Sequence, residues 1–308
     1  MENRPSVIKG PMAFTPDDGE VFRRLGREWE LSDLYGYVLD DQVPLVVVMG
    51  ESGAGKTSLL RAGLSHILPD QDVDYYYWEA LNRDPEARLV QAVKGIEGLD
   101  DLVNVSEKVC PRPKVIVLDQ FEQLPARAAE HNPIYQLLLR VAREGRAPHR
   151  VTWIVSFRRE YMADWYDAFQ IPLREQGFYP PTLSVQLFSR PQARDVVTTL
   201  CDEANLQVDN KVVDNLIDAA TEQDLVSPVD IGIGMMMLTA LARDERFTKK
   251  DYRFAGKADG ILAAYIEKTL ALVPEEHKKS LLQAMLALRD ESNAYARLAE
   301  GRDVKDIA

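Results

Sequence analysis

The sequence has few residues of the kinds that build disulfide scaffolds and metal sites. Only two cysteines occur among its 308 residues, Cys110 and Cys201. Secreted proteins that depend on disulfides carry more cysteines, in pairs, so we expect two reduced thiols in a cytoplasmic protein. The four histidines show no metal-ligand spacing among themselves or with the cysteines. The sequence therefore predicts no zinc site.

The chain also lacks a surplus of positive charge and a long apolar run. Its 37 Lys and Arg residues are outnumbered by 49 Asp and Glu residues, and the formal net charge is −12 at pH 7. A general nucleic-acid-binding protein needs the opposite balance, because it neutralises phosphates. The most apolar stretch, Ile231–Ala242, is far shorter than the roughly 20 residues of a membrane span, and Met1–Lys9 contains no apolar signal region. We expect a soluble protein with no membrane partner and no general affinity for nucleic acid.

Strand-like and helix-like segments alternate before residue 188. Continuous apolar runs are typical of strands that are buried on both faces of a parallel sheet. Five segments are predicted as strands: Leu45–Met49, Val73–Trp78, Val115–Leu118, Val151–Phe157 and Leu183–Leu187. Helices are predicted between them, at 56–68, 84–93, 134–142 and 160–176. This order predicts an α/β fold with a doubly wound parallel sheet.

The pattern changes after Phe188, where helical segments follow one another with little strand signal. Ser189 and Gln192 fit a capping box, and Ser227 followed by Pro228 is a second helix start. The predicted helices span 191–205, 209–221, 228–243, 259–272 and 276–289. We predict four parts: a lead-in at 1–25, an α/β domain at 26–188, a helical lid domain at 189–246, and a further helical, winged-helix-like domain at 257–308. The polar stretch 247–256 is the predicted linker.

A glycine-rich loop follows the first predicted strand. Residues 50–58 read GESGAGKTS and match the pattern G-x-x-x-x-G-K-[ST]. The glycines let the backbone wrap closely, so that amide N–H groups point at phosphate oxygens, and the following helix adds its positive N-terminal dipole. Lys56 is expected to reach the terminal phosphates and Thr57 to bind Mg²⁺. The predicted ATP- or GTP-binding residues of this loop are Gly50, Glu51, Ser52, Gly53, Ala54, Gly55, Lys56, Thr57 and Ser58.

Residues after the third and fourth strands supply the predicted hydrolytic chemistry. Asp119 ends the run VIVLD, at the sheet edge where ligands bind, and is predicted to hold Mg²⁺. Gln120 and Glu122 are both candidates for orienting the attacking water, and Glu122 is favoured because a carboxylate also accepts a proton. An exposed loop acid is an almost equally good interpretation of Glu122. Arg158 and Arg159 lie just past the fourth predicted strand, where an arginine could contact a γ-phosphate, although surface arginines are also ordinary.

Several short motifs occur together in a fixed order. Gly10-Pro11 is followed by Phe14 and Asp17, then by G-R-E-x-E at 26–30, GESGAGKTSLLRAGL, VLDQFEQL and WIVSFRREY. In this combination the chain resembles the STAND NTPases, a class of signal-transduction ATPases that includes apoptotic and immune switch proteins. The resemblance covers about residues 10–245 and is greatest to the bacterial branch found in conflict and defence systems. Gln123 stands where that branch has a second acid, which predicts inefficient hydrolysis.

The resemblance implies further roles. Gly26 and Arg27 would lie beside the adenine, Arg158 would be the sensor arginine, and Pro228 would pack on the nucleotide. The sequence around Pro228 matches the family only loosely, and Met235–Met237 is interpreted as helical core. In this family ADP holds a closed monomer, whereas ATP permits homo-oligomerisation and activates a fused effector. The effector and sensor domains are expected outside this chain.

Two other functions compete with an ATP/ADP switch that hydrolyses ATP slowly. One is a motor or loader ATPase with continuous turnover. The other is a P-loop kinase, which would have an Arg-rich lid and one compact domain, whereas over a hundred residues follow the sheet in this chain. The switch and the motor are therefore favoured, and the rate of turnover distinguishes them.

Overall fold

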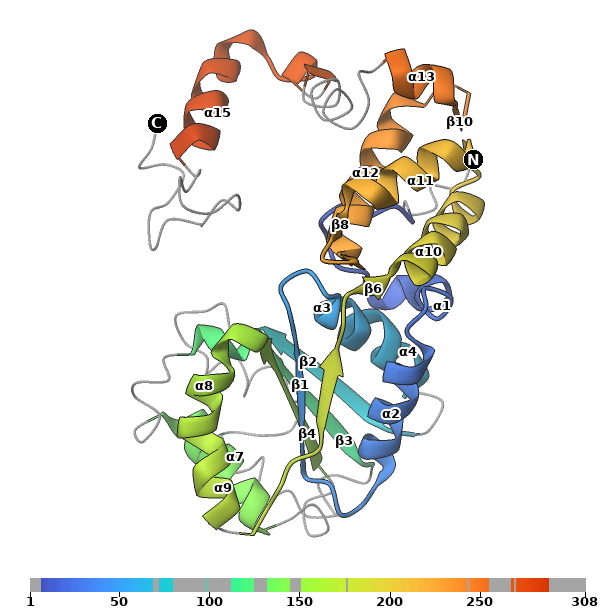
Figure 1. Cartoon of the computed structure of the whole chain (residues 1–308). Coiled ribbons are helices and arrows are strands. Elements are labelled where there is room, and N and C mark those ends of the chain that lie inside the picture. Colours follow the sequence, from blue (N-terminus) through green and yellow to red (C-terminus); the bar gives the residue numbers. More distant parts are fainter. Residues whose placement is uncertain are drawn as a thin grey trace. The chain divides into compact units, whose positions relative to one another are not determined.

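The computed structural model describes residues 7–68, 72–79, 98, 112–124, 132–144, 151–175, 177–242, 244–254, 267–268 and 270–287. The chain divides into two compact units, Met1–Met236 and Met237–Ala308. The first unit holds the sheet and the glycine-rich loop (Figure 1). The predicted helix 84–93 and Cys110 lie outside the described residues.

A parallel sheet of five strands forms the centre of the first unit, in the order β2–β3–β4–β1–β5. The strands are β1 (Leu45–Gly50), β2 (Asp74–Glu79), β3 (Lys114–Asp119), β4 (Val151–Arg158) and β5 (Thr182–Val185). The five predicted strands are confirmed. Their carboxyl ends meet at one edge, where Gly50 lies beside Arg158 and Glu79 lies beside Asp119.

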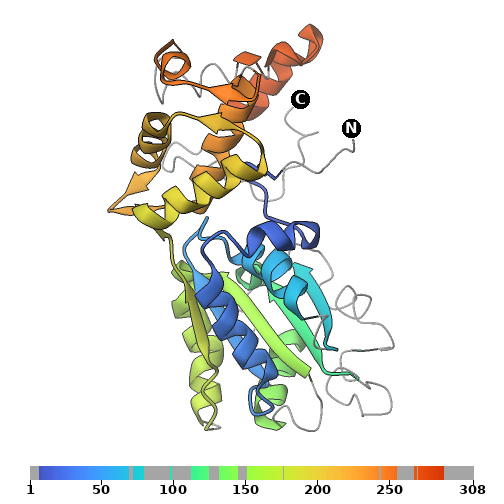
Figure 2. The ribbon, with the colours of Figure 1, turned by 90° about the vertical axis from the view of Figure 1, so that its right-hand side faces the viewer.

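Helices cover both faces of this sheet (Figures 1 and 2). One face carries α2 (Glu28–Leu39) and the helix that follows the loop, with segments α3 (Lys56–Ser58), η2 (Leu59–Leu64) and α4 (Ser65–Ile67). The other face carries α7 (Pro133–Glu144), α8 (Met162–Trp165), η7 (Tyr166–Gln170) and α9 (Ile171–Glu175). Helix α7 packs on an aromatic cluster in which Phe121, Tyr135 and Phe169 are in ring contact. The doubly wound α/β fold is confirmed.

Helix α2 has no counterpart among the predicted helices. Its start carries no side-chain cap, because Arg27 occupies the capping position, so the usual start signal is missing. Its apolar spacing was nevertheless present in the sequence, since Leu31, Leu34 and Val38 lie on one buried face. Helix α2 matters for function because it places Arg27 beside the glycine-rich loop.

The region after Phe188 is mainly helical, with α10 (Arg190–Glu203), α11 (Asn210–Ala219) and α12 (Pro228–Leu241). The predicted capping box is confirmed: the Ser189 amide donates to Gln192 Oε1 at 3.0 Å. The structure adds short strands that the sequence did not predict, which form a small antiparallel sheet of β6 (Phe188–Ser189), β8 (Thr221–Glu222) and β9 (Leu225–Val226). Two residues are too few to show a period of two.

The second unit begins inside α12 and contains β10 (Arg246–Phe247), α13 (Lys249–Phe254) and α15 (Glu275–Ala287). Helix α13 lies in the stretch 247–256, which was predicted as a linker. The Thr248 amide donates to Asp251 Oδ2 at 2.9 Å, so a capping signal was hidden in that polar stretch. The predicted domain boundaries stay predictions. In the part of the chain that the structure describes, no helix is long and apolar enough to cross a membrane.

Candidate nucleotide-binding site

The glycine-rich loop curls at the carboxyl end of β1, before the helix that starts at Lys56. Gly53 and Gly55 have φ angles of +78° and +92°, in the left-handed region that strains any other residue. A Cβ at Gly53 would also lie 3.1 Å from Ser227 Oγ, so the start of α12 approaches the loop closely. The loop therefore requires glycine for its own turn and for contact with α12.

Lys56 lies inside the curl of this loop. Its ammonium group donates to the carbonyl oxygens of Gly50 and Glu51, both at 2.9 Å. Burial lowers the pKa of Lys56, while the nearby carboxylates of Glu122 and Asp119 raise it. Two neutral carbonyls leave the positive charge uncompensated by direct contact, which suits the binding of a phosphate group.

Thr57 and Asp119 converge at the carboxyl end of β3. The Thr57 hydroxyl donates to Asp119 Oδ2 at 2.7 Å, and the Gln120 amide donates to Asp119 Oδ1 at 2.9 Å. The Thr57 hydroxyl and the Asp119 carboxylate supply hard oxygen ligands of the kind that Mg²⁺ prefers. No cluster of three or more His, Cys, Asp or Glu suited to a metal occurs among the described residues. The pair fits a Mg²⁺ ion that takes its other ligands from phosphates and water.

Glu122 and Arg158 form an ion pair at the same edge. Arg158 Nε lies 3.2 Å from Glu122 Oε1, and the Glu122 side chain is only 3% exposed. The other carboxylate oxygen, Oε2, is buried and has no hydrogen-bond partner within the described ranges. Burial raises the pKa of Glu122, and the charges of Arg158 and Lys56 oppose that rise. The Glu122 side chain is thus buried and ion-paired, unlike the exposed loop acid of the alternative interpretation, and its role as a base stays a prediction.

These side chains line an open cavity of about 410 Å³, which we call the phosphate cavity. Lys56, Thr57, Asp119 and Arg158 all face it, as the sequence predicted that they would lie together. Gln120 and Glu122 line it as well, so both candidates for orienting water belong to the same cavity. Gln120 has a φ of +55°, an uncommon conformation for a residue other than glycine. Such strain is often found at functional sites.

A second cavity of about 70 Å³ adjoins the first, and we call it the apolar pocket. Its walls come from the N-terminal segment, the loop and the helices after Phe188, and include Ile8, Phe14, Leu25, Phe188, Val196 and Ile231. The phosphate cavity and the apolar pocket share Gly55 and Ser58. The Ser58 hydroxyl accepts a hydrogen bond from the Phe14 amide at 3.1 Å, which ties the N-terminal segment to the loop. The phosphate cavity and the apolar pocket therefore meet at the glycine-rich loop.

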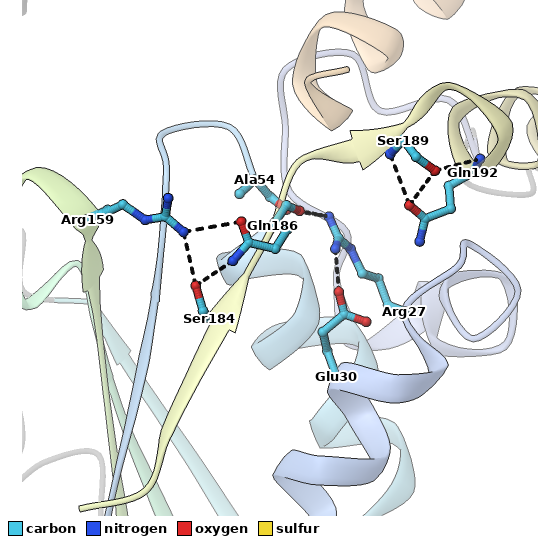
Figure 3. A network of polar contacts seen from close by, with 8 residues as sticks. All are labelled: Arg27, Glu30, Ala54, Arg159, Ser184, Gln186, Ser189 and Gln192. Atoms are coloured by element: carbon cyan, nitrogen blue, oxygen red, sulfur yellow. Dashed lines mark hydrogen bonds and ion pairs between the residues drawn. The ribbon is translucent and has the colours of Figure 1, made fainter. Parts of the chain in front are cut away.

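Arg27 fastens the apolar pocket to the loop (Figure 3). Its guanidinium donates to the carbonyls of Ala54 and Gln186, both at 2.8 Å, and to Glu30 at 2.5 Å. Burial lowers the pKa of Arg27, which the Glu30 carboxylate opposes. The Arg27 guanidinium also lies 4.2 Å from the ring centre of Phe188. Arg27 therefore lines the pocket while its donors hold the pocket walls together.

The other residues implied by the family resemblance lie at different places. Pro228 lines the apolar pocket, whereas Gly26 is not among the residues that line it. Arg159 donates to Ser184 Oγ and Gln186 Oε1, at 3.1 and 3.2 Å (Figure 3), and its guanidinium lies 3.6 Å from Glu51 Oε1. Of the two neighbouring arginines, Arg158 is thus the one that pairs with Glu122, and its role as the sensor arginine stays a prediction. The assignment of Gly26 and Arg27 to the adenine stays a prediction.

Sequence reasoning missed a group on β2 that reaches this site. The Tyr77 hydroxyl donates to Asp119 Oδ2 at 2.6 Å, and Glu79 lines the phosphate cavity. Burial and the adjacent Asp119 carboxylate raise the pKa of Tyr77 far above its ordinary value, so this hydroxyl stays a donor. The alternation of Tyr77 and Glu79 along β2 was visible in the sequence, but nothing in the sequence indicated that β2 lies beside β3.

Comparison with solved structures finds the same fold in other proteins. A Walker-type ATPase of Pyrococcus abyssi matches with a TM-score of 0.55 at 14% identity, over 86% of this chain and 77% of that chain. The ORC2 protein of Aeropyrum pernix, in its ADPNP–ADP complexes, matches with a TM-score of 0.57 at 16% identity, over 91% and 75%. Cdc6p from Pyrobaculum aerophilum matches with a TM-score of 0.58 at 13% identity, over 92% and 78%. These similarities show a shared P-loop fold.

The sequence comparisons are more specific. No curated protein matches the chain. The family described as Novel STAND NTPase 1 matches residues 9–306, which is nearly the whole sequence. The chain therefore belongs to the Novel STAND NTPase 1 family of P-loop NTPases.

Proposed function

We propose that this NTPase is an ATP/ADP switch, in which the bound nucleotide sets the arrangement of α12 and the N-terminal segment against the sheet. The observation that carries the proposal is the composition of the apolar pocket. Its walls combine residues 7–14, the glycine-rich loop, and residues of α10 and α12. A nucleotide in the two cavities would therefore contact segments that are far apart in the sequence, and its identity would shift their equilibrium by its difference in affinity for the two states.

The chemistry of the apolar pocket favours adenine over guanine. Guanine presents N1–H and N2–H₂ donors, for which a carboxylate is a good acceptor. No Asp or Glu belongs to the set of described residues that line the pocket. An apolar pocket with backbone groups suits the smaller polar edge of adenine. We therefore assign ATP and ADP, and not GTP and GDP, as ligands.

Slow hydrolysis is the second part of the proposal. Mg²⁺ held between Thr57, Asp119 and the phosphates would neutralise negative charge. Glu122 Oε2 is the free oxygen that would accept a proton from water, while Oε1 is held by Arg158. A γ-phosphate would compete with Glu122 for the Arg158 guanidinium. Binding of ATP would therefore release Glu122 from this ion pair, which links ATP binding to hydrolysis. Gln123, in place of a second acid, is consistent with a low rate.

The biological part of the proposal follows the family resemblance. ADP would hold a closed monomer, and ATP would permit homo-oligomers that activate an effector outside this chain, in a signalling or defence response in the cytoplasm. A motor-type ATPase with continuous turnover is the second candidate. The P-loop fold of this chain is shared by all three solved structures named above and is compatible with either function. The rate of ADP release distinguishes them, because a motor releases ADP rapidly and a switch retains it.

Small-angle scattering tests the switch. We expect different profiles for the protein with Mg²⁺-ADP and with a non-hydrolysable ATP analogue. Arg158→Ala should bring the two profiles closer together, because the γ-phosphate loses its contact. Arg159→Ala controls for the loss of a neighbouring positive charge, since its guanidinium contacts Ser184, Gln186 and the loop residue Glu51 but not Glu122. Identical profiles and identical mass in both nucleotide states would contradict the proposal, and rapid steady-state release of ADP would favour the motor.

A further inference from the structure

Strand β2 presents three polar side chains to the helix that follows the glycine-rich loop. Tyr75, Tyr77 and Glu79 alternate along the strand and therefore share one face of the sheet. The Tyr75 hydroxyl donates to the carbonyl oxygen of Leu60, in the π-helical segment η2, at 2.8 Å. Glu79 lies 3.6 Å from the guanidinium of Arg61, in the same segment. Strand β2 thus connects this helix to the edge of the sheet where Asp119 lies.

Tyr77 is the member of this group that contacts Asp119. Its hydroxyl lies 2.6 Å from Asp119 Oδ2 and 3.1 Å from Glu79 Oε1. The ring lies under the Arg61 guanidinium, whose central carbon is 5.3 Å from the ring centre. Arg61 and Glu79 therefore hold Tyr77 from two sides, and the tyrosine has little freedom to rotate away from Asp119.

The contacts of Asp119 show what Tyr77 does. The carboxylate is 1% exposed, so water cannot orient it. Oδ1 is held by the Gln120 amide, and Oδ2 accepts two hydroxyl hydrogen bonds, from Thr57 and from Tyr77. The Thr57 hydroxyl is itself a predicted Mg²⁺ ligand, and it can bind the metal through a lone pair while its hydrogen stays on Asp119. Tyr77 is the side-chain donor to Asp119 that is not itself a predicted metal ligand, and it fixes the rotation of the carboxylate from the β2 side.

We propose that Tyr77 is a positioning residue for the metal site: it orients Asp119 toward Mg²⁺, and Glu79 and Arg61 hold it in place. This inference rests on the proposed nucleotide site. Tyr77 lies on a different strand from both phosphate motifs, and neither motif contains it. Groups that orient a metal ligand commonly change metal affinity by about 10- to 100-fold when they are removed. The expected effect is therefore on Mg²⁺ and not on the nucleotide itself.

The test uses Tyr77→Phe and, as matched control, Tyr75→Phe. Each variant removes one buried hydroxyl from the same face of β2, but only Tyr77 contacts Asp119. Binding of a fluorescent ADP analogue is measured with EDTA and then across a MgCl₂ titration, and thermal melting is recorded for each protein. In Tyr77→Phe we expect the half-saturating Mg²⁺ concentration to rise about tenfold or more, with unchanged binding in EDTA. Tyr75→Phe should match the wild type.

A second variant covers the case in which Tyr77→Phe folds poorly. In Glu79→Gln the Tyr77 hydroxyl still reaches Asp119, but the neighbouring carboxylate, which is also the ion-pair partner of Arg61, is lost. We therefore expect the half-saturating Mg²⁺ concentration to rise about threefold, which is below the range for a lost orienting group. Unchanged Mg²⁺ dependence in Tyr77→Phe, or an equal rise in Tyr75→Phe, would overturn the inference. If the wild type itself bound the analogue with no Mg²⁺ dependence, the proposed metal site would fail first, and the two failures are thereby distinguished.

Discussion

The phosphate cavity and the apolar pocket meet at the glycine-rich loop, yet they are built in different ways. The cavity takes Asp119 and Arg158 from the carboxyl ends of neighbouring strands, close to the loop that holds Lys56. The pocket combines the glycine-rich loop with 7–14, 188–200 and 228–232, segments that no single motif contains. The charged groups therefore come from short motifs and strand ends, whereas the pocket in which we propose that the base binds depends on packing between distant segments.

Among the substitutions that test this comparison, we expect the largest effect from one that removes catalysis in the phosphate cavity. Glu122→Gln keeps the size of the side chain but removes the base, and general base catalysis contributes about 10² to 10⁴ in rate. We expect single-turnover hydrolysis to fall by at least about 100-fold, with ADP affinity unchanged. Quenched-flow measurements with labelled ATP give the rate. An unchanged rate would make Glu122 a bystander and move the role to Gln120.

Binding in the same cavity should respond next most strongly. Lys56→Ala removes the cation placed at the terminal phosphates, and a hydrogen bond to a charged group is worth about 1.5–3 kcal/mol. ATP affinity should fall by roughly 10- to 100-fold, and ADP affinity should fall less. Titration calorimetry measures both. Equal ATP affinity for variant and wild type would contradict the assignment of the loop.

The apolar pocket should show the reverse pattern, with equal losses for ADP and ATP. Ile231 lines the pocket and is 1% exposed, so Ile231→Ala removes contacts with the base but none with the phosphates. Affinity for both nucleotides should fall by about tenfold, as expected for lost apolar contacts. Ile217→Ala is the control, because Ile217 is similarly buried but does not line the pocket. A loss confined to ATP would show that the two cavities are not separate in function.

The pH profile should give the smallest effect and again concern only the phosphate cavity. Burial raises the pKa of Glu122, and a base must be deprotonated to act. Hydrolysis should therefore decline as the pH falls, beginning at a higher pH than an ordinary glutamate would give. Nucleotide affinity over that range should change less. The acidic limb should be absent from the residual activity of Glu122→Gln, and its persistence there would assign it to another group.

The sequence predicted most of the phosphate cavity because its parts lie in short motifs. The loop at 50–58 and the acid that ends β3 could be placed from a strand, a turn and a helix alone, and the structure brings them together. Arg158 and Arg159 could be placed after the fourth strand, but only the family resemblance favoured Arg158, and the structure then showed β4 ending beside β1. Glu122 was ambiguous in the sequence, since burial depends on how the chain packs.

Other features of the fold and of the site could not be predicted from the sequence. Helix α2 begins without a capping side chain, so Arg27 was recognised only through family resemblance and its contacts with Ala54 and Gln186 were not foreseen. Helix α13 was hidden in a polar stretch. Tyr77 lies 42 residues from Asp119, and only the pairing of β2 with β3 makes them neighbours.

The amino-acid sequence by itself determined the chemistry of this protein: a glycine loop that cradles phosphates, a lysine and a threonine at fixed spacing, and an acid at the end of an apolar strand. Those features act over a few residues, where backbone geometry follows from residue type. Tertiary structure alone decided which oxygen of Asp119 accepts from Tyr77, which arginine meets Glu122, and which segments form the apolar pocket. Each of these depends on contacts between distant segments, which form only when the whole first unit packs around its sheet.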